Sequence, residues 1–150
     1  MTTPLKRMLE SLTSTAQIDP TEHSLNISPN RIESLGYALA GWLYMLRYQK
    51  NTRIMSVASI AILIVGLWLQ ISLQDWAILI VTITIVWMAE FLNAAVEAVV
   101  NLVTREFHPM AKVAKDVAAA AVLLGAVASV LVGLLILGPP LLVRLGIVIP

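Results

Sequence analysis

The chain has 150 residues, of which 59% are hydrophobic and only 13% are charged. A soluble domain is about half apolar and a quarter charged, so this composition indicates a membrane protein, and the length indicates a single domain. The net charge of +1 gives no reason to expect a nucleic acid partner, and the absence of Cys excludes disulfides and cysteine zinc sites.

Residues 1–27 do not have the continuous apolar segment of a signal peptide, because prolines and charged side chains interrupt them. They are rich in Ser and Thr, which favours a mobile N-terminal tail. A second interpretation stays open, a short helix resting on the membrane surface. It is suggested by four apolar residues at helical spacing: Leu5, Met8, Leu9 and Leu12.

Residues 29–49 predict an amphipathic helix at the membrane surface. Ser28 can cap this helix, and Pro29 suits its first turn. Apolar residues recur at helical spacing but are mixed with charged ones, and the Trp and Tyr side chains suit the boundary between lipid and water. The pattern is therefore typical of an interfacial helix rather than of a span.

Three apolar segments follow, at about residues 54–73, 76–103 and 117–137. Each is close to the ~20 residues that a helix needs to cross a bilayer. The short connection "LQDW" predicts a hairpin between the first two spans, and "GPP" is expected to end the third. The remaining residues, 138–150, form a C-terminal tail too short to span again. The predicted fold class is an all-α membrane protein.

The basic residues predict the orientation of these spans. Every Lys and Arg except Arg144 lies before the first span or between the second and third. Basic residues concentrate on the cytoplasmic side of membrane proteins. We therefore expect a cytoplasmic N-terminus and a cytoplasmic connection at residues 104–115.

The second span contains "VWMAEFLNAAVEAVVN", residues 86–101, with four polar side chains. Successive helical residues advance by about 100°, so these four share one stripe that leads toward the cytoplasmic end. They are Glu90, Asn93, Glu97 and Asn101. A carboxylate at mid-membrane costs roughly 2.5–3.5 kcal/mol on insertion scales, so two acids on one stripe require a reason.

Three explanations compete for the stripe: polar contacts that hold helices together, an ion or proton relay, and a metal and phosphate site. The following segment, "REFHPMAKVAKD", favours the third, since acids can hold Mg²⁺ and a Lys can interact with phosphate as a point charge. Alone, His108 is a weak signal, and Lys112 fits a membrane anchor. The chain has no GxxxxGK[ST] loop, so a nucleotide site here would be of another type.

The segments "AEFLNAAVEAVVN", "EFHPMAKVAKDVAAAAVL" and "YQKNTRI" resemble the small prokaryotic diacylglycerol kinase family, which includes undecaprenol kinases. The resemblance covers about residues 31–137. It implies a homotrimeric kinase of the bacterial inner membrane, with a surface helix and three transmembrane helices per subunit. It also implies ATP as co-substrate, Mg²⁺, and a membrane lipid substrate, either diacylglycerol or undecaprenol. The alternative is a non-catalytic or proton-conducting helical bundle.

Residue by residue, the resemblance implies that Glu90 is the catalytic base and that Glu97 bridges Mg²⁺ to the nucleotide phosphates. It implies further nucleotide contacts at Tyr37, Asn93, Glu106, His108, Lys115 and Asp116. Two positions depart from the family pattern: Gln49 replaces a second metal-ligating Glu, and Asn101 replaces an Asp that is common there. Gln49 can still offer a neutral carbonyl oxygen to the metal, but both changes remove negative charge from its surroundings.

Overall fold

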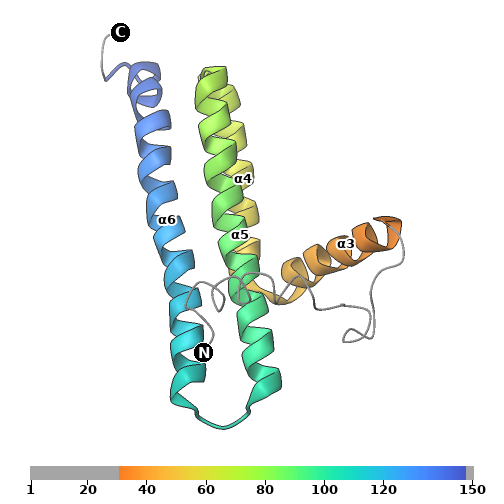
Figure 1. The fold of residues 1–150 in the computed structure, drawn as a ribbon. Coiled ribbons are helices and arrows are strands. Elements are labelled where there is room, and N and C mark those ends of the chain that lie inside the picture. The colour runs from red at the N-terminus through yellow and green to blue at the C-terminus, as the bar shows by residue number, and fades with distance from the viewer. Residues whose placement is uncertain (1–30, 148–150) are drawn as a thin grey trace, which may run out of the picture. The chain divides into compact units, whose positions relative to one another are not determined.

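The computed structural model describes residues 31–147, which form only helices and their connections (Figure 1). Helix α3 spans Arg31–Tyr48, α4 spans Lys50–Leu69, α5 spans Leu73–Val103 and α6 spans Pro109–Arg144. The last three are long and apolar enough to cross a membrane. An amphipathic helix followed by three apolar ones confirms the predicted helical class. The expectations for residues 1–30, including the Ser28 cap, lie outside the described residues.

The chain divides into two compact units, Met1–Trp42 and Leu43–Pro150. Within the second unit, the Arg53 guanidinium donates from Nε to the Leu46 carbonyl at 3.1 Å and from Nη2 to the Arg47 carbonyl. The last carbonyls of a helix have no partner inside it, so this side chain of α4 caps the end of α3. A single extended residue, Gln49, then leads into α4.

The turn between α4 and α5 is fixed by a capping box. The Ser72 hydroxyl accepts a hydrogen bond from the Asp75 N–H at 3.1 Å, and the Asp75 carboxylate accepts one from the Ser72 N–H at 3.3 Å. These bonds satisfy N–H groups that the first helical turn cannot pair internally. Helix α5 therefore starts at Leu73, before the expected start at Trp76, because Ser72 and Asp75 cap its N-terminal end.

Helix α4 ends in a left-handed residue that is not glycine. Gln70 has a φ of 55°, its N–H donates to the Leu67 carbonyl at 3.3 Å, and the next N–H donates to the Gly66 carbonyl, also at 3.3 Å. The Trp76 ring of α5 packs closely against the backbone of α4 at position 66. This position requires glycine, because a Cβ there would lie 2.8 Å from the Trp76 ring. Two bonds of this pattern close the helix end, but they hold Gln70 in a conformation that favours Gly.

Replacing Gln70 with Gly should stabilise the protein by about 1 kcal/mol, because Gly adopts the left-handed conformation without a steric cost. The change can be measured by reversible unfolding in mixed micelles. Gly146, at the end of α6, has a φ of 69° and is the matched control. Gly146→Ala should destabilise by a similar amount. Destabilisation by Gln70→Gly would mean that its side chain makes a contribution larger than the backbone strain.

Helix α6 is longer in both directions than the predicted third span. It begins at Pro109, where a missing N–H costs nothing because the first turn has no internal acceptor for it. It also continues through Pro139 and Pro140 to Arg144, so "GPP" does not end it. Interior prolines are tolerated in membrane helices where neighbouring groups satisfy the freed carbonyls. Beyond them, the Arg144 guanidinium lies 5.6 Å from the centre of the Trp68 ring on α4, which ties the extension to the bundle.

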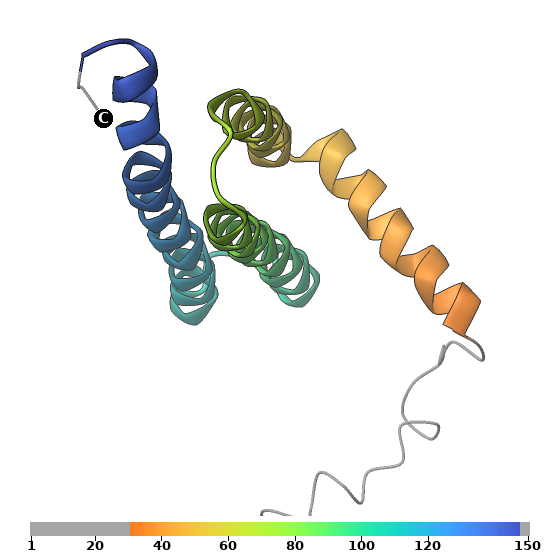
Figure 2. The same ribbon diagram turned by 90° about the horizontal axis from the view of Figure 1, so that it is seen from above.

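Helices α4, α5 and α6 run alternately up and down and form a cluster in which each contacts the other two (Figures 1 and 2). The most extensive packing joins α5 to α6, where Gly125 brings α6 close to Val86. The Trp87 indole N–H donates to the Ser59 hydroxyl at 3.2 Å and links α5 to α4. Most apolar side chains on these helices point outward, which is typical of a protein that crosses a membrane several times.

Candidate active site

The polar stripe lies on one uninterrupted helix, because α5 runs from Leu73 to Val103 without a break. Its four residues become more exposed toward the end of the helix that leads to residues 104–108. Glu90 is 2% exposed, Asn93 and Glu97 are half-buried, and Asn101 is exposed. The stripe therefore connects the interior of the bundle with the loop that joins α5 to α6.

Glu90 lies in a pocket between α4, α5 and α6, which we call the Glu90 pocket. This pocket has a volume of about 340 Å³ and is lined by Asn51, Ile54, Met55, Val86, Glu90, Asn93, Ala119, Val122, Leu123 and Ala126. The Glu90 Oε2 and Asn93 Oδ1 atoms are buried and have no hydrogen-bond partner in the described part of the chain. An unpaired buried acceptor costs free energy, so each of these two atoms is able to accept a hydrogen bond from a ligand in the pocket.

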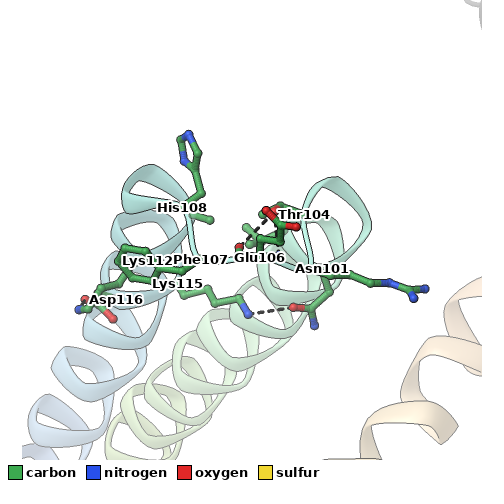
Figure 3. Close-up of a pocket in the computed structure, with 11 residues that line it drawn as sticks. Asn101, Thr104, Glu106, Phe107, His108, Lys112, Lys115 and Asp116 are labelled. Carbon is green, nitrogen blue, oxygen red and sulfur yellow. Dashed lines mark hydrogen bonds and ion pairs between the residues drawn. The ribbon is translucent and has the colours of Figure 1, made fainter.

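A second pocket, of about 830 Å³, lies at the connection between α5 and α6 (Figure 3). We call it the loop-end pocket. Its lining is mostly polar or charged and comprises Val100, Asn101, Thr104, Arg105, Glu106, Phe107, His108, Ala111, Lys112, Lys115 and Asp116. The structure thus gathers four of the predicted nucleotide contacts, Glu106, His108, Lys115 and Asp116, around one opening.

Local hydrogen bonds shape the short loop beside this pocket. The Thr104 hydroxyl accepts a hydrogen bond from the Glu106 N–H and donates one to the Glu106 carbonyl, both at 3.1 Å. His108 caps α6, since its Nδ1 accepts from the Met110 N–H at 3.2 Å. Such bonds between a hydroxyl and its neighbouring backbone are typical of tight turns. The capping bond gives His108 a structural role at the start of α6, and the nucleotide contact expected at this residue stays a prediction.

The two lysines of the loop-end pocket have different partners. Lys112 forms an ion pair with Asp116, one helical turn further along α6, and both side chains are largely exposed. The Lys115 ammonium instead donates to the Asn101 Oδ1 at 2.8 Å and so bridges α6 to α5 (Figure 3). The pocket therefore contains a lysine held across two helices by a neutral amide.

Three predicted residues line neither pocket. Glu97 is half-buried on α5, one turn from Asn93 and one turn from Asn101. Gln49 is the N-cap residue before α4, and its side chain makes no capping hydrogen bond. Tyr37 lies on the part of α3 that belongs to the unit Met1–Trp42, and it is exposed there.

The donor set can be compared with what Mg²⁺ requires. Among residues 31–147, no group of three or more His, Asp or Glu side chains could hold a metal ion by itself. Mg²⁺ usually takes one or two protein carboxylates and completes its shell with substrate phosphates and water. One carboxylate on Glu97 and the amide of Gln49, which makes no capping hydrogen bond, fit an ion that arrives with a nucleotide rather than one held permanently.

The sequence alone predicted no functional role for several residues at the two pockets. Thr104 and Arg105 line the loop-end pocket, and Asn51 lines the Glu90 pocket. Thr52, in the first turn of α4, is fully buried, and its hydroxyl oxygen has no partner in the described structure. For Thr104 a signal existed, because Thr directly after a predicted helix favours a turn. For Asn51 and Thr52 of α4, only the tertiary structure shows that the first lines the pocket and that the second is buried.

Comparison with known proteins gives a consistent set of relatives. Residues 36–137 match the family described as prokaryotic diacylglycerol kinase. The chain is 40% identical over 122 residues to a diacylglycerol kinase from Synechocystis, which covers 81% of this chain and 70% of that protein. It is 41% identical over 95 residues to an undecaprenol kinase from Bacillus subtilis, covering 63% and 77% of the two chains. A diacylglycerol kinase from Escherichia coli is 29% identical over 104 residues, covering 67% and 82%.

Proposed function

The chain belongs to the prokaryotic diacylglycerol kinase family and is an ATP-dependent lipid kinase, and from this premise we propose that Glu90 is its catalytic base. The observation that carries the proposal is the state of its carboxylate. Glu90 is 2% exposed, lines a pocket between three helices and has an Oε2 without a partner among the described residues. A general base needs an acceptor that is open to the proton it removes, and this atom provides one.

The length of α5 supports a meeting point for lipid and nucleotide near Glu90. Counted from Leu73, the ~20 residues that cross the hydrocarbon layer end near Leu92. Glu90 then lies just inside this layer, whereas the loop-end pocket lies among the headgroups. A lipid hydroxyl can reach Glu90 from the bilayer, and ATP can reach the same region from water. The basic residues at this end support a cytoplasmic N-terminus in a bacterial inner membrane.

We assign the loop-end pocket to the nucleotide. Lys115 presents an ammonium to it, and an ammonium attracts phosphate as a point charge. The other proposed nucleotide contacts are Tyr37, Asn93, Glu97, Glu106, His108 and Asp116. Glu97 and Gln49 would hold Mg²⁺, which when bound offsets the negative charge of the phosphates. The Gln49 side chain makes no capping hydrogen bond, which supports this assignment.

The reaction is a transfer of the γ-phosphoryl group of ATP to the lipid hydroxyl. The hydroxyl oxygen forms a bond to the γ-phosphorus while the bond from that phosphorus to the oxygen of the departing ADP breaks. The hydroxyl proton passes to the Glu90 carboxylate, so the products are a lipid phosphate and ADP. Phosphoryl transfer depends mainly on positioning and on electrostatic stabilisation, for which these polar groups are sufficient.

The proposal includes assembly as a homotrimer with active sites formed between subunits. Helix α6 has no buried residue within the single chain, and α5 exposes large apolar side chains along its length. Packing of small and apolar side chains is the main source of helix association in a membrane. This outward apolar surface supports contact with neighbouring subunits.

A lipid phosphorylation assay tests the proposed activity. Full-length protein in detergent is incubated with Mg²⁺ and ATP labelled at the γ-phosphate, with diacylglycerol and undecaprenol in parallel tubes. We expect label in the lipid fraction of at least one tube. One relative is a diacylglycerol kinase and another of similar identity is an undecaprenol kinase, so either lipid can be the acceptor. A tube without lipid is the control for ATP hydrolysis.

The pattern of label also decides between the two lipids, for which the sequence has no residue-level signature. Label in one tube alone identifies the acceptor class. Intact ATP in both tubes, from protein of the correct size and helicity, contradicts the proposed function. That result would favour a non-catalytic or proton-conducting bundle.

A further inference from the structure

We propose that Asn101 is a positioning residue, which aims the Lys115 ammonium at the loop-end pocket without neutralising its charge. The proposal rests on the proposed role of Lys115 in binding ATP. Its basis is the hydrogen bond from Lys115 Nζ to Asn101 Oδ1, which is 2.8 Å long and joins α6 to α5 (Figure 3). Lys side chains lose much rotamer freedom when they are ordered, and this bond orders Lys115 before a ligand arrives.

The neighbouring carboxylate does not compete for Lys115. Asp116 is the next residue along α6, so it points about 100° away around the helix. It pairs with Lys112, which lies one turn earlier on the same face. This is the only ion pair within the described range, 31–147. Lys115 therefore keeps a charge that no described carboxylate matches.

The chemistry of the amide explains why the charge stays available. A lysine ammonium has three donors, of which Asn101 occupies one, so two can still bind phosphate oxygens. A carboxylate at position 101 would form an ion pair with Lys115 and would also repel the triphosphate. An amide holds the lysine by a hydrogen bond, more weakly than a carboxylate would, but it adds no negative charge. Asn101 in place of the Asp that is common in the family is therefore a functional difference of this chain.

Substitutions at position 101 separate positioning from charge. Asn101→Asp should raise the KM for MgATP by about fivefold, the upper range for an exposed charge pair, with a smaller change in kcat. This increase should shrink as salt is added, because salt screens exposed charges. Asn101→Ala should lower kcat/KM about threefold to tenfold, which corresponds to the net contribution of one ordinary hydrogen bond and suits a bond that is exposed to solvent. Asn101→Gln keeps the amide acceptor and should recover part of this loss.

A double-mutant cycle tests whether Asn101 acts through Lys115. Asn101→Ala is measured alone and in the Lys115→Ala background, for kcat, for KM and for binding of a non-hydrolysable MgATP analogue. If the amide works only by holding the lysine, Asn101→Ala should have no further effect once Lys115 is gone. Gln74→Glu makes the matched change from amide to acid at the opposite end of α5, where Gln74 is exposed, and should leave the KM unchanged.

Distinct results contradict the inference and the function on which it rests. An equal loss from Asn101→Ala in both backgrounds, or a lower KM in Asn101→Asp, overturns the positioning role while the lipid kinase activity stands. An unchanged KM in Lys115→Ala removes the nucleotide role of Lys115, and the positioning role with it. Because Asn101 is exposed, the variants should fold, and gel filtration together with circular dichroism checks this.

Discussion

Substituting Gln for Glu90 should lower kcat for lipid phosphorylation by about 10²–10⁴-fold, the usual contribution of a general base. Gln has nearly the shape of Glu, so the buried site stays filled, but its amide cannot accept the proton of the lipid hydroxyl. Binding of the MgATP analogue should change little, because Glu90 lines the pocket between the three helices and not the loop-end pocket. The measurement is initial rate at saturating lipid and ATP.

Glu106→Gln is the matched comparison for this variant. It makes the same chemical change in an exposed loop residue of the loop-end pocket, and its effect should appear mainly in the KM for ATP. A kcat for Glu90→Gln that is close to the wild-type value would show that another group accepts the proton. Loss of nucleotide binding in Glu90→Gln would instead indicate that the site has collapsed, and Glu90→Asp, which keeps a carboxylate, would then decide whether the charge or the shape is required.

Glu97→Gln should raise the Mg²⁺ concentration for half-maximal activity by at least about tenfold, since even outer-shell partners of a metal site contribute 10–100-fold in affinity. The effect is expected to be large because Glu97 is the only carboxylate in the proposed metal set, which otherwise contains the neutral Gln49. Activity is measured as a function of free Mg²⁺ at fixed ATP. An unchanged Mg²⁺ dependence would remove Glu97 from the metal site.

Moving the carboxylate from position 97 to position 49 gives a sharper test of whether Glu97 and Gln49 hold the metal together. In Glu97→Gln combined with Gln49→Glu, the number of acids is that of the wild type, so the Mg²⁺ requirement should return toward the wild-type value. Gln49→Glu alone should leave activity the same or lower the Mg²⁺ requirement. Gln74→Glu in the Glu97→Gln background is the control, because the added acid then lies at the far end of α5. Rescue by that control as well would mean that only net charge matters.

Much of the fold was predictable from the sequence, because membrane helices are determined locally. A backbone in lipid must satisfy its own hydrogen bonds, so a long apolar run forms a helix whatever its neighbours are. The three apolar helices and the amphipathic one before them were identified for this reason. The stripe from Glu90 to Asn101 was also readable, because the angle between residues on one helix depends only on helix geometry.

Helix ends were less predictable because single residues and distant contacts decide them. The capping box of Ser72 and Asp75 moves the start of α5 to Leu73. Helix α6 passes through two prolines and ends only at Arg144, whose guanidinium contacts Trp68 of another helix. An apolar run indicates where a helix must exist, but its exact limits depend on caps and packing partners.

By itself, the sequence determined the helical class, the polar stripe and the family, since each depends on residue type and spacing along one segment. Only the tertiary structure decided which polar groups are buried and which are paired. It placed Glu90 between three helices with an Oε2 that has no partner among residues 31–147, and it brought Lys115 to Asn101 across two helices. These pairings depend on how α4, α5 and α6 rotate and pack against one another, and that is a property of the whole bundle rather than of any segment.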